Sequence, residues 1–268
     1  MNDHPEMTTV APVQPPAGYI GGKRRLAARI IERIAKVPHR TYAEAFVGMG
    51  GVFFRRPTAA RAEVINDRNG EVANLFRILQ RHYPQFMDTL RWQLSGRREF
   101  DRMKASDPAT LTDLERAGRF LYLQRTAFGG KVAGQTFGVD PRSGGGFNLT
   151  RLEPLLADVH ERLAGVVIEN LDWLAFIDRY DRPETLFYLD PPYWGSEGDY
   201  GRELFGRDQF DVMAERLAGL KGKFILSIND VPEIRQTFAS FSMDGVDLRY
   251  SVSGGAGTPA KELIVSNL

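Results

Sequence analysis

A chain of 268 residues is long enough for one large domain, or for a domain that carries an insertion. Apolar residues make up 43% and charged residues 26%, as in an ordinary soluble globular protein. The absence of cysteine excludes disulfides and thiolate metal sites. No apolar run approaches the roughly 20 residues that span a bilayer, so we expect a cytoplasmic enzyme without a membrane segment.

The net charge of +1 hides an uneven distribution of charged side chains. Between Arg91 and Arg151 there are 11 Lys and Arg residues against 6 Asp and Glu residues, which leaves the rest of the chain mildly acidic. Such a basic segment suits contact with a polyanion. A solvated surface with a chance asymmetry would look the same, and charge alone does not separate the two interpretations.

The first 16 residues contain four prolines and lack the basic and apolar pattern of a signal peptide, so we expect a loose tail there. Beyond it, helix and strand patterns alternate. The expected order is a helix over 22–36, a strand over 41–47, a strand over 63–66 and a helix over 71–80. This alternation predicts an α/β fold with a largely parallel sheet.

The alternation stops between residues 83 and 151, where helical stretches and glycine-rich passages show no strand period. It resumes with strands over 166–170 and 186–189, a helix over 208–220, a strand over 223–228, and a terminal hairpin from 247–252 and 262–265. The simplest account is one α/β domain, residues 17–82 and 152–268, split by a mainly helical inserted subdomain, residues 83–151.

A glycine-rich turn, Gly48 to Gly51, follows the strand over 41–47, and Asp67 follows the next strand. Glycines at such a turn let the backbone approach a ligand, and an acidic residue after the second strand can accept hydrogen bonds from ribose hydroxyls. Phe53 stands where the dinucleotide fingerprint has its third glycine, which favours a nucleoside ligand without a pyrophosphate. The alternatives are a purely structural turn and an Asp67 that caps the following helix.

A rigid turn, Asp190-Pro191-Pro192-Tyr193, follows the apolar strand over 186–189. Two prolines cannot continue a strand ladder, so the backbone turns at the carboxyl end of the strand. Open α/β sheets bind their ligands at that edge. The sequence therefore presents Asp190 to a cleft, with an aromatic ring three residues on. A strand that simply ends in a Pro-Pro turn with a surface aspartate is the structural alternative.

An acid and a ring in this arrangement suit the amino group of an aromatic base. The lone pair of the adenine amino group is delocalised into the ring, which makes the nitrogen a poor nucleophile. A carboxylate that accepts one N–H and a carbonyl that accepts the other would make the nitrogen more electron-rich. Tyr193 could stack on the base, a contact worth about 1–3 kcal/mol in single-strand binders. Asp190 is a poor final base at its ordinary pKa, so we expect the proton to leave to solvent.

Taken together, these segments resemble the Dam-like DNA adenine methyltransferases. Asp-Pro-Pro-Tyr at 190–193 is similar to the catalytic motif of amino-directed DNA methyltransferases, and Phe-Val-Gly-Met-Gly at 46–50 to their cofactor motif. Tyr-Ile-Gly-Gly-Lys at 19–23 resembles the family's N-terminal cofactor motif. Further similar segments are Asn66-Asp67, Leu171-Asp172-Trp173 and the strand over 224–229. The order of the motifs also matches, over most of the chain outside the insert.

The resemblance implies a Rossmann-like sheet that binds S-adenosyl-L-methionine, with a target-recognition insert. It implies that Asp190, Pro191, Pro192 and Tyr193 hold the target adenine. The implied cofactor contacts are Tyr19, Gly22, Lys23, Phe46, Gly48, Gly50, Asp67, Asp172 and Asp190. The family often has tryptophan where Tyr19 stands, and the change keeps an aromatic ring. Without the resemblance, Lys23 is simply a solvated lysine in the first turn of a helix.

Basic side chains in the insert are interleaved with aromatic ones. The expected DNA contacts are Arg97, Arg98, Arg125, Lys131 and Arg142, in a segment that also contains Arg102, Arg116 and Arg119. A glycine-rich hairpin over 129–146 could enter a groove of the duplex. Phe120 and Leu121 are better explained as the core of the insert.

We therefore predict a site-specific DNA methyltransferase that flips adenine out of the duplex and transfers a methyl group in line to its 6-amino group. Its expected partner is double-stranded DNA, with a cognate restriction endonuclease as a candidate second partner and a monomer as the favoured state. No metal is required, and the four histidines are scattered along the chain.

Three alternatives stay open at this point. The same fold could act on cytosine, RNA or a protein glutamine, although the resemblance associates serine in place of Asp190 with cytosine and asparagine with glutamine. An inactive DNA-binding module is a second alternative, and the intact turn at 190–193 argues against it. A dinucleotide oxidoreductase is the third, disfavoured by the missing third glycine.

Overall fold

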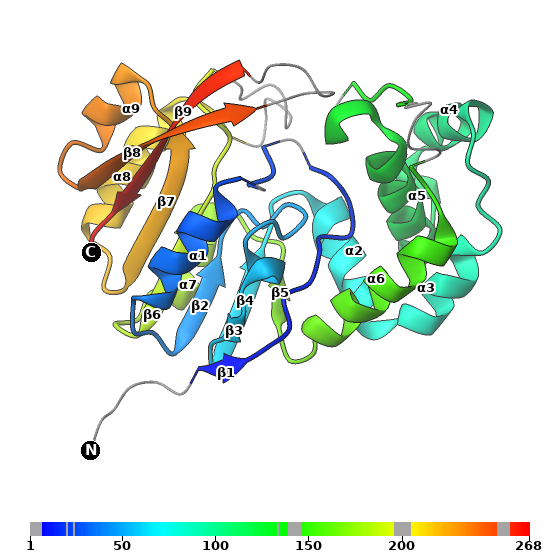
Figure 1. Ribbon diagram of the computed structural model, residues 1–268, viewed down its shortest axis with the longest axis horizontal. Coiled ribbons are helices and arrows are strands. Elements are labelled where there is room, and N and C mark those ends of the chain that lie inside the picture. Colours follow the sequence, from blue (N-terminus) through cyan, green and yellow to red (C-terminus); the bar gives the residue numbers. More distant parts are fainter. Residues whose placement is uncertain are drawn as a thin grey trace.

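The computed structural model describes residues 7–19, 21–23, 25–132, 134–138, 146–195, 205–250 and 258–268. A seven-stranded sheet forms the centre of the molecule (Figure 1). Its strands follow one another in the order β5 (Val167–Glu169), β4 (Ala62–Asn66), β2 (Thr41–Glu44), β6 (Thr185–Leu189), β7 (Lys223–Asn229), β9 (Thr258–Ser266) and β8 (Ser242–Tyr250). The first five strands are parallel, and β9 and β8 are antiparallel to their neighbours. The predicted α/β fold is confirmed.

Alternate residues of the central strands pack into two separate apolar cores. Tyr42 and Leu186 belong to one core, and their neighbours Ala43 and Phe187 belong to the other. The first core is covered by α1 (Ala27–Ala35), α2 (Gly70–Arg81) and the helices of the insert, and the second by α7 (Trp173–Tyr180), α8 (Asp208–Ala218) and α9 (Pro232–Thr237). Because side chains alternate across a strand, a sheet buried on both faces reads as a nearly continuous apolar run.

Two expected elements are shorter than the sequence patterns suggest. The first helix begins at Ala27 rather than at residue 22, and the strand expected over 41–47 ends at Glu44. Gly22 is instead held in a turn by a hydrogen bond from its N–H to the Tyr19 carbonyl, 3.0 Å. Val47 donates to the Asn66 carbonyl at 2.9 Å and leads into the glycine turn. Both shortened stretches border the site described below.

The loose tail expected over residues 1–16 is wrong for residues 7–16, and residues 1–6 lie outside the described part of the chain. A short strand, β1 (Thr8–Thr9), pairs with β3 (Thr58–Ala59). Val13 is buried, and its N–H donates to the Phe54 carbonyl at 2.7 Å. Apolar burial and backbone pairing thus hold this proline-rich segment against the domain.

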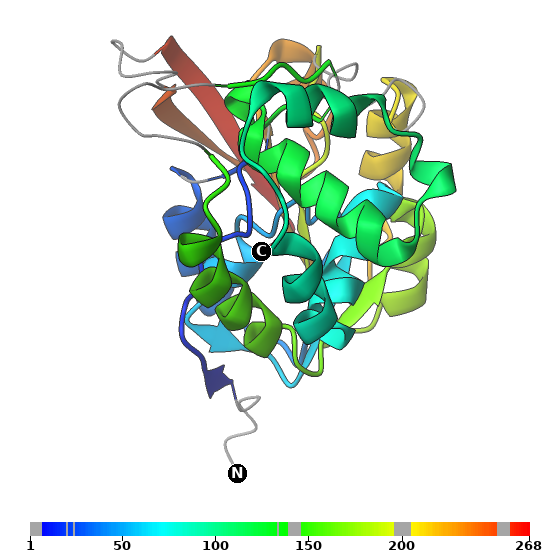
Figure 2. The same ribbon diagram turned by 90° about the vertical axis from the view of Figure 1, so that its right-hand side faces the viewer.

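The insert is mainly helical, lies to one side of the sheet in Figure 1, and faces the viewer in Figure 2. It contains α3 (Tyr83–Leu90), α4 (Arg97–Ala105) and α5 (Asp113–Thr126), and the boundary expected after residue 151 falls inside α6 (Leu149–Arg162). Phe120 and Leu121 are buried, as predicted. The apolar core of these helices is continuous with that beneath α2, so α2 and the insert pack as neighbours rather than as separate bodies.

The antiparallel end of the sheet agrees with the hairpin predicted from residues 247–252 and 262–265. Both strands are longer than predicted, and residues 251–252 lie outside the described part of the chain. β9 lies between β7 and β8, so it runs next to a central strand of the sheet. This position brings residues near the carboxyl terminus of the chain close to the ends of the parallel strands.

Candidate active site

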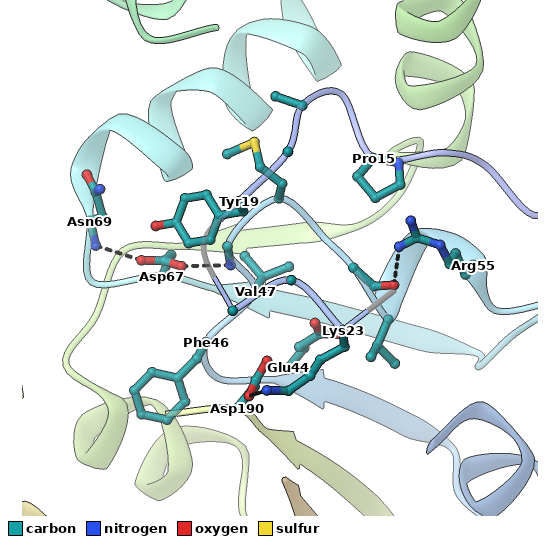
Figure 3. A pocket seen from close by; sticks show the side chains of 18 of the residues that line it. Pro15, Tyr19, Lys23, Glu44, Phe46, Val47, Arg55, Asp67, Asn69 and Asp190 are labelled. Carbon is teal, nitrogen blue, oxygen red and sulfur yellow. Dashed lines mark hydrogen bonds and ion pairs between the residues drawn. The ribbon is translucent and has the colours of Figure 1, made fainter. Parts of the chain in front are cut away.

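A cavity of about 550 Å³ opens where β2, β4 and β6 end (Figure 3). The segment around Tyr19 to Lys23 and the glycine turn after β2 both border it. Eight of the predicted catalytic and cofactor residues line this cavity: Tyr19, Gly22, Lys23, Phe46, Gly48, Asp67, Asp190 and Pro192. Residues from four separate segments of the sequence therefore meet at one edge of the sheet.

The glycine turn has a backbone shape that side chains rarely tolerate. Gly48 and Gly50 have φ values of +50° and +74°. A Cβ on Gly48 would lie 2.9 Å from the ring of Tyr19, and a Cβ on Gly50 would lie 2.3 Å from the ring of Phe54. Gly48 thus lets an aromatic ring lie against the backbone at the cavity wall. Gly50 does not line the cavity, and its role in the turn is conformational.

Asp67 lies just beyond β4 and accepts two backbone hydrogen bonds. The N–H of Gly48 donates to Oδ2 and the N–H of Asn69 donates to Oδ1, both at 2.8 Å. Burial raises the pKa of Asp67 to about 6, against the lowering effect of these two bonds. The cap of α2 is Asn69, whose side chain accepts from the Glu71 N–H, so the helix-cap alternative for Asp67 is wrong.

Asp190 follows β6 directly and forms an ion pair with Lys23, whose Nζ lies 2.8 Å from Asp190 Oδ1. Ser227 Oγ donates to the same oxygen at 3.3 Å. Burial raises the pKa of Asp190 to about 6; Lys23 lowers it, and the charge of Glu262 raises it further. A carboxyl group with this pKa is ionised at neutral pH, yet it lies in a largely water-excluded position.

Lys23 is almost fully buried, with 2% of its surface exposed. Its interpretation as a solvated helix lysine is therefore wrong, because the side chain turns inward to Asp190 instead of outward to water. Lys23 Nζ also donates to the hydroxyl of Tyr193 and lies 4.1 Å from the centre of that ring. One cation thus contacts both the first and the last residue of the turn at 190–193.

The turn itself is well packed. Pro191 and Pro192 are buried, and Tyr193 is partly buried. The hydroxyl of Tyr193 donates to the carboxylate of Glu262 on β9. Tyr193 does not line the cavity of Figure 3, although its ring lies against Lys23, which does.

Glu44 is a site residue that our sequence reasoning did not single out. It is the last residue of β2, it is 2% exposed, and it lines the cavity beside Asp190. Burial raises the pKa of Glu44 to about 8, although the hydroxyl of Tyr42, 2.6 Å away, donates to it. The available signal was an acidic residue at the end of a buried strand, immediately before the glycine turn.

Asp172 is separate from this group of residues. Its side chain accepts from the Leu174 N–H at 2.9 Å and caps the amino end of α7. It does not line the cavity. An aspartate at this position has a sufficient structural reason in the cap alone.

The predicted DNA contacts are spread over the insert, and one of them points inward. Arg97 and Arg98 are exposed on α4, and Lys131 is exposed after α5. Arg125 is half-buried, donates to the carbonyls of Gly146 and Pro16 at 3.1 Å each, and lines the cavity. Arg142, and much of the hairpin expected over 129–146, lie outside the described part of the chain.

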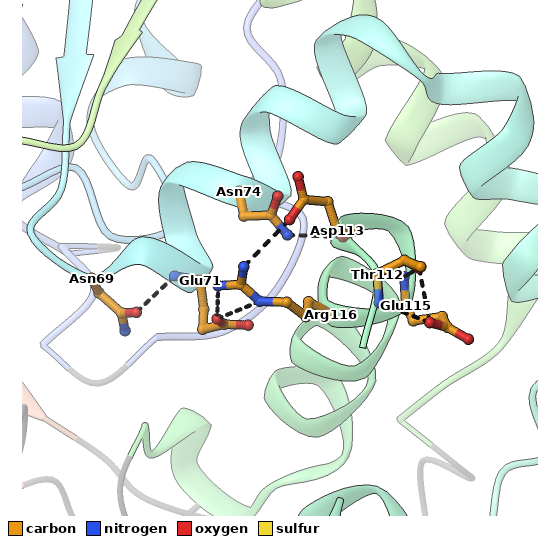
Figure 4. Close-up of polar contacts among 7 residues, drawn as sticks. All are labelled: Asn69, Glu71, Asn74, Thr112, Asp113, Glu115 and Arg116. Carbon is orange, nitrogen blue, oxygen red and sulfur yellow. Dashed lines mark hydrogen bonds and ion pairs between the residues drawn. The ribbon is translucent and has the colours of Figure 1, made fainter. Parts of the chain in front are cut away.

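Another arginine of the insert, Arg116, connects the insert to the α/β domain. Arg116 on α5 donates to the carboxylate of Glu71 on α2, and Asn74 Nδ2 donates to the Asp113 carbonyl at 2.9 Å (Figure 4). Thr112 and Glu115 form a capping box at the start of α5. Part of the positive charge of the insert is therefore neutralised by an ion pair within the protein.

Fold and site together define a class of protein. A mostly parallel sheet ends in a glycine turn, a partly buried acid after β4, and an Asp-Pro-Pro-Tyr turn beside a cavity large enough for a nucleoside. These are features of an α/β enzyme that binds a nucleoside cofactor. Comparison with known proteins identifies which enzymes of this class the chain is related to.

The chain belongs to the D12 class N6 adenine-specific DNA methyltransferase family, whose model matches residues 19–252. It is 21% identical over 230 residues to the type II methyltransferase M.CviBI of Paramecium bursaria Chlorella virus NC1A, covering 85% of this chain and 88% of that protein. It is 29% identical over 124 residues to the type II methyltransferase M1.LlaDCHI of Lactococcus lactis subsp. cremoris, covering 44% and 43% of the two chains.

Among solved structures, a ribosomal protein L11 methylase from Lactobacillus delbrueckii subsp. bulgaricus matches 94% of this chain and 82% of its own. The two are 11% identical with a TM-score of 0.38, a level that supports no argument about function. The family itself carries the assignment. The protein is an adenine-specific DNA methyltransferase that uses S-adenosylmethionine as its methyl donor.

None of the described helices is both long and apolar enough to cross a membrane. The described part of the chain holds no group of three or more histidine, aspartate or glutamate side chains that could bind a metal ion.

Proposed function

We propose that the turn at 190–193 holds the target adenine and that the adjoining cavity holds S-adenosylmethionine. The observation that carries this proposal is the position of Asp190, which lines the cavity and also begins the turn. A group in this place can contact both the cofactor and the base. Asp190 and the backbone carbonyls of the turn are the acceptors for the two N–H groups of the adenine amino nitrogen.

The ionisation of Asp190 determines whether it can accept a hydrogen bond from the amino group and whether it can keep the proton afterwards. Above pH 6 its carboxylate accepts a hydrogen bond from the amino group, which increases the electron density on nitrogen. S-adenosylmethionine supplies the electrophilic methyl group when it is bound. Lys23, which pairs with Asp190, holds the carboxylate in one orientation. The proton that the amino group loses passes to solvent, because a carboxyl group with this pKa does not retain it at neutral pH.

The cavity fits the cofactor in size and in chemistry. Its volume is typical of a small-molecule site, and its walls combine apolar side chains with charged and polar ones. We assign Asp67 to the ribose hydroxyls, and Tyr19, Phe46 and Gly48 to the walls that enclose the nucleoside. Gly22 and Lys23 border the same space. For Asp172 we propose a cap of α7, and for Gly50 a role in turn geometry, in place of direct cofactor contacts.

We propose that the insert is the target-recognition subdomain. Arg97, Arg98 and Lys131 are exposed and are available to neutralise phosphates, and Arg142 is proposed from its sequence alone. The adenine must leave the base stack to reach a turn that is partly buried, so base flipping is part of the proposal. Arg125 is assigned a different task, since it ties α5 to the segment that borders the cofactor cavity.

For the setting of the reaction, we propose a cytoplasmic monomer that acts on duplex DNA. Both curated relatives carry the name type II methyltransferase, and on that likeness we propose a cognate restriction endonuclease of the same sequence specificity. Protection of methylated DNA against cleavage by such an endonuclease, and the mass of the enzyme in solution, are the measurements that test these points.

The central test measures methyl transfer from labelled S-adenosylmethionine to unmethylated duplex DNA, with the product nucleoside identified by mass spectrometry. We expect N6-methyladenine with the native protein. Asp190→Ala should lower the rate by about 100- to 1,000-fold, the typical cost of removing a group that stabilises the transition state. The matched control is Asp178→Asn on α7, which removes an exposed carboxylate paired with Arg216 of α8.

Different outcomes separate the parts of the proposal. Full activity of Asp190→Ala would exclude this residue from the site. Tight cofactor binding without transfer to DNA would move RNA or protein amides ahead as substrates. A folded protein that fails to bind S-adenosylmethionine would contradict the assignment of the cavity.

A further inference from the structure

Glu262 is a buried acid whose position the motifs do not explain. It lies on β9 and is 1% exposed, between Lys261 and the fully buried Leu263. A carboxylate in such a place is costly unless polar groups compensate for the lost water. Its partners include the hydroxyl of Tyr193, which donates to it, and Lys23 Nζ at 4.0 Å from Oε2. Both partners belong to the proposed active site.

A second residue that contacts the segment at 193–194 lies directly opposite Glu262 in the sheet. Glu262 on β9 pairs with Asn229 on β7. The side chain of Asn229 accepts from the Trp194 N–H and donates to the Trp194 carbonyl, each at 3.0 Å. Facing residues of two antiparallel strands therefore hold consecutive residues of the chain, Tyr193 by its hydroxyl and Trp194 by its backbone.

Lys23 links this pair to the reacting carboxylate. Its Nζ lies between Asp190, at 2.8 Å from Oδ1, and Glu262, and it also donates to the Tyr193 hydroxyl. The ring of Tyr193 is thus held at its hydroxyl by two groups from distant parts of the chain. A ring stacks favourably on a base only at the correct angle. Because Tyr193 is already held in place, less conformational entropy is lost when the base binds.

We propose that Glu262 is a positioning residue for adenine methylation, which holds the ring of Tyr193 for the flipped base and shares Lys23 with Asp190. This proposal rests on the proposed contact between Tyr193 and the adenine. Glu262 itself touches neither reactant. It acts by accepting a hydrogen bond from the Tyr193 hydroxyl and by competing with Asp190 for the positive charge of Lys23.

The charge of Glu262 also affects the titration of Asp190. The titratable and charged groups that face Asp190 are Lys23 from the N-terminal segment, Glu44 from β2, Tyr188 from β6 and Glu262 from β9, together with the hydroxyl of Ser227 from β7. Glu262 raises the pKa of Asp190, whereas Lys23 lowers it. Removal of the Glu262 charge therefore lowers this pKa, and Asp190 stays ionised to a more acidic pH.

The test compares Glu262→Gln, Tyr193→Phe and the double variant of the full-length protein in steady-state methylation of duplex DNA. Tyr193→Phe removes the bond between phenol and carboxylate and keeps the ring, and Glu262→Gln removes the negative charge and replaces the charge-assisted acceptor by a neutral amide oxygen. We expect each to lower kcat by about 10- to 100-fold, as for small misplacements in other active sites. The double variant should be no slower than the worse single variant, because both changes act on the same contact between the Tyr193 hydroxyl and residue 262.

Two further readouts separate positioning from a merely structural role. The affinity for S-adenosylmethionine, measured by calorimetry, should stay within about twofold of the native value, since neither residue lines the cofactor cavity. The acid limb of the kcat profile should move to lower pH in Glu262→Gln. Asp244→Asn is the matched control, because it removes a carboxylate from the adjacent strand β8 that is paired with Arg33 at the surface.

The proposal is overturned if Glu262→Gln keeps kcat within twofold, or if the losses of the two single variants multiply in the double variant. If Glu262→Gln fails to fold, Tyr193→Phe decides, and native kcat in that variant overturns the proposal. Failure of the proposed function looks different: the native enzyme itself would then transfer no methyl group to DNA.

Discussion

At the scale of single residues, the site depends on how buried charges compensate one another. Lys23 is surrounded by Asp190, Glu262 and the ring of Tyr193, and it is nearly excluded from water. Asp67 instead accepts hydrogen bonds from two backbone N–H groups. The two carboxyl groups reach the same pKa of about 6 by different balances of burial and attraction. Their substitutions should therefore differ in effect.

Asp67→Asn should weaken binding of S-adenosylmethionine by about 10- to 100-fold, the cost of losing charge-assisted hydrogen bonds to the ribose. In the native protein, binding should also weaken as pH falls through about 6, because Asp67 becomes protonated there. Calorimetry between pH 5 and 8 measures both effects. An affinity in the variant equal to the native value at neutral pH would remove Asp67 from the cofactor site.

Gly50→Ala should lower the free energy of unfolding by about 2–5 kcal/mol, because the residue has a positive φ and the new Cβ meets the Phe54 ring. Gly70→Ala is the control, since its Cβ would make only an ordinary contact, 3.7 Å from Asn170, at the start of α2. Urea denaturation of both variants measures the difference. Equal stabilities would show that the turn relaxes around a side chain.

At the scale of elements, the insert and the terminal hairpin have similar tasks: each brings distant residues to the edge of the parallel strands. α5 holds the N-terminal segment through Arg125, and Gln124 donates to the Gly18 carbonyl at 3.4 Å. β9 brings Glu262 to Tyr193. Periodicity predicted both elements in outline, because apolar spacing reports which face is buried. It did not indicate which polar side chains turn inward, since arginines at interior and exterior positions look alike in sequence.

The exposed basic residues of α4 provide a direct test of the insert. Replacing Arg97 and Arg98 together by alanine should weaken duplex binding and reduce the slope of log affinity against log salt by about 2, roughly one per lost phosphate contact. Fluorescence anisotropy at 50–200 mM salt measures this slope.

The control variant also removes two positive charges, at a site far from α4. Lys36→Ala with Arg40→Ala changes two cations between α1 and β2, at the end of the sheet away from the cavity. An unchanged slope in the α4 variant, or the same loss in the control, would contradict a phosphate contact by α4.

At the scale of the whole molecule, the buried acids of the site make stability depend on pH. The pKa of Glu44 is about 8 in the folded protein, against 4.5 for the unperturbed group. The folded state therefore binds a proton that the unfolded chain has lost, and this contribution to stability disappears as pH rises from about 4.5 through 8. Asp67 and Asp190 act in the same direction up to about pH 6.

Glu44→Gln should be more stable than the native protein at pH 8, by on the order of 1 kcal/mol or more, and similar to it near pH 5. Glutamine cannot ionise and can still accept the hydrogen bond from Tyr42. Chemical denaturation across this range measures the difference. Glu184→Gln, at an exposed residue paired with Arg40, should show no such trend. A difference that does not grow with pH would indicate that Glu44 is ionised throughout.

The fold class, the order of the motifs and the rigid turn at 190–193 all follow from the amino-acid sequence alone. These properties are local: strand and helix periods, glycines that permit a positive φ, and two prolines that end a strand. The resemblance placed Tyr19, Lys23, Phe46 and Asp67 in one site, and all four line the same cavity.

Which charged side chains compensate one another depends on the folded arrangement. It buried Lys23 against Asp190 and Glu262, turned Arg125 inward, and used Asp172 as a helix cap. The physical reason is that ion pairing depends on distance in space, and the partners lie far apart in the chain. Apolar periodicity indicates which face of a helix or strand is buried. It does not indicate which polar side chain from a distant part of the sequence will contact that face.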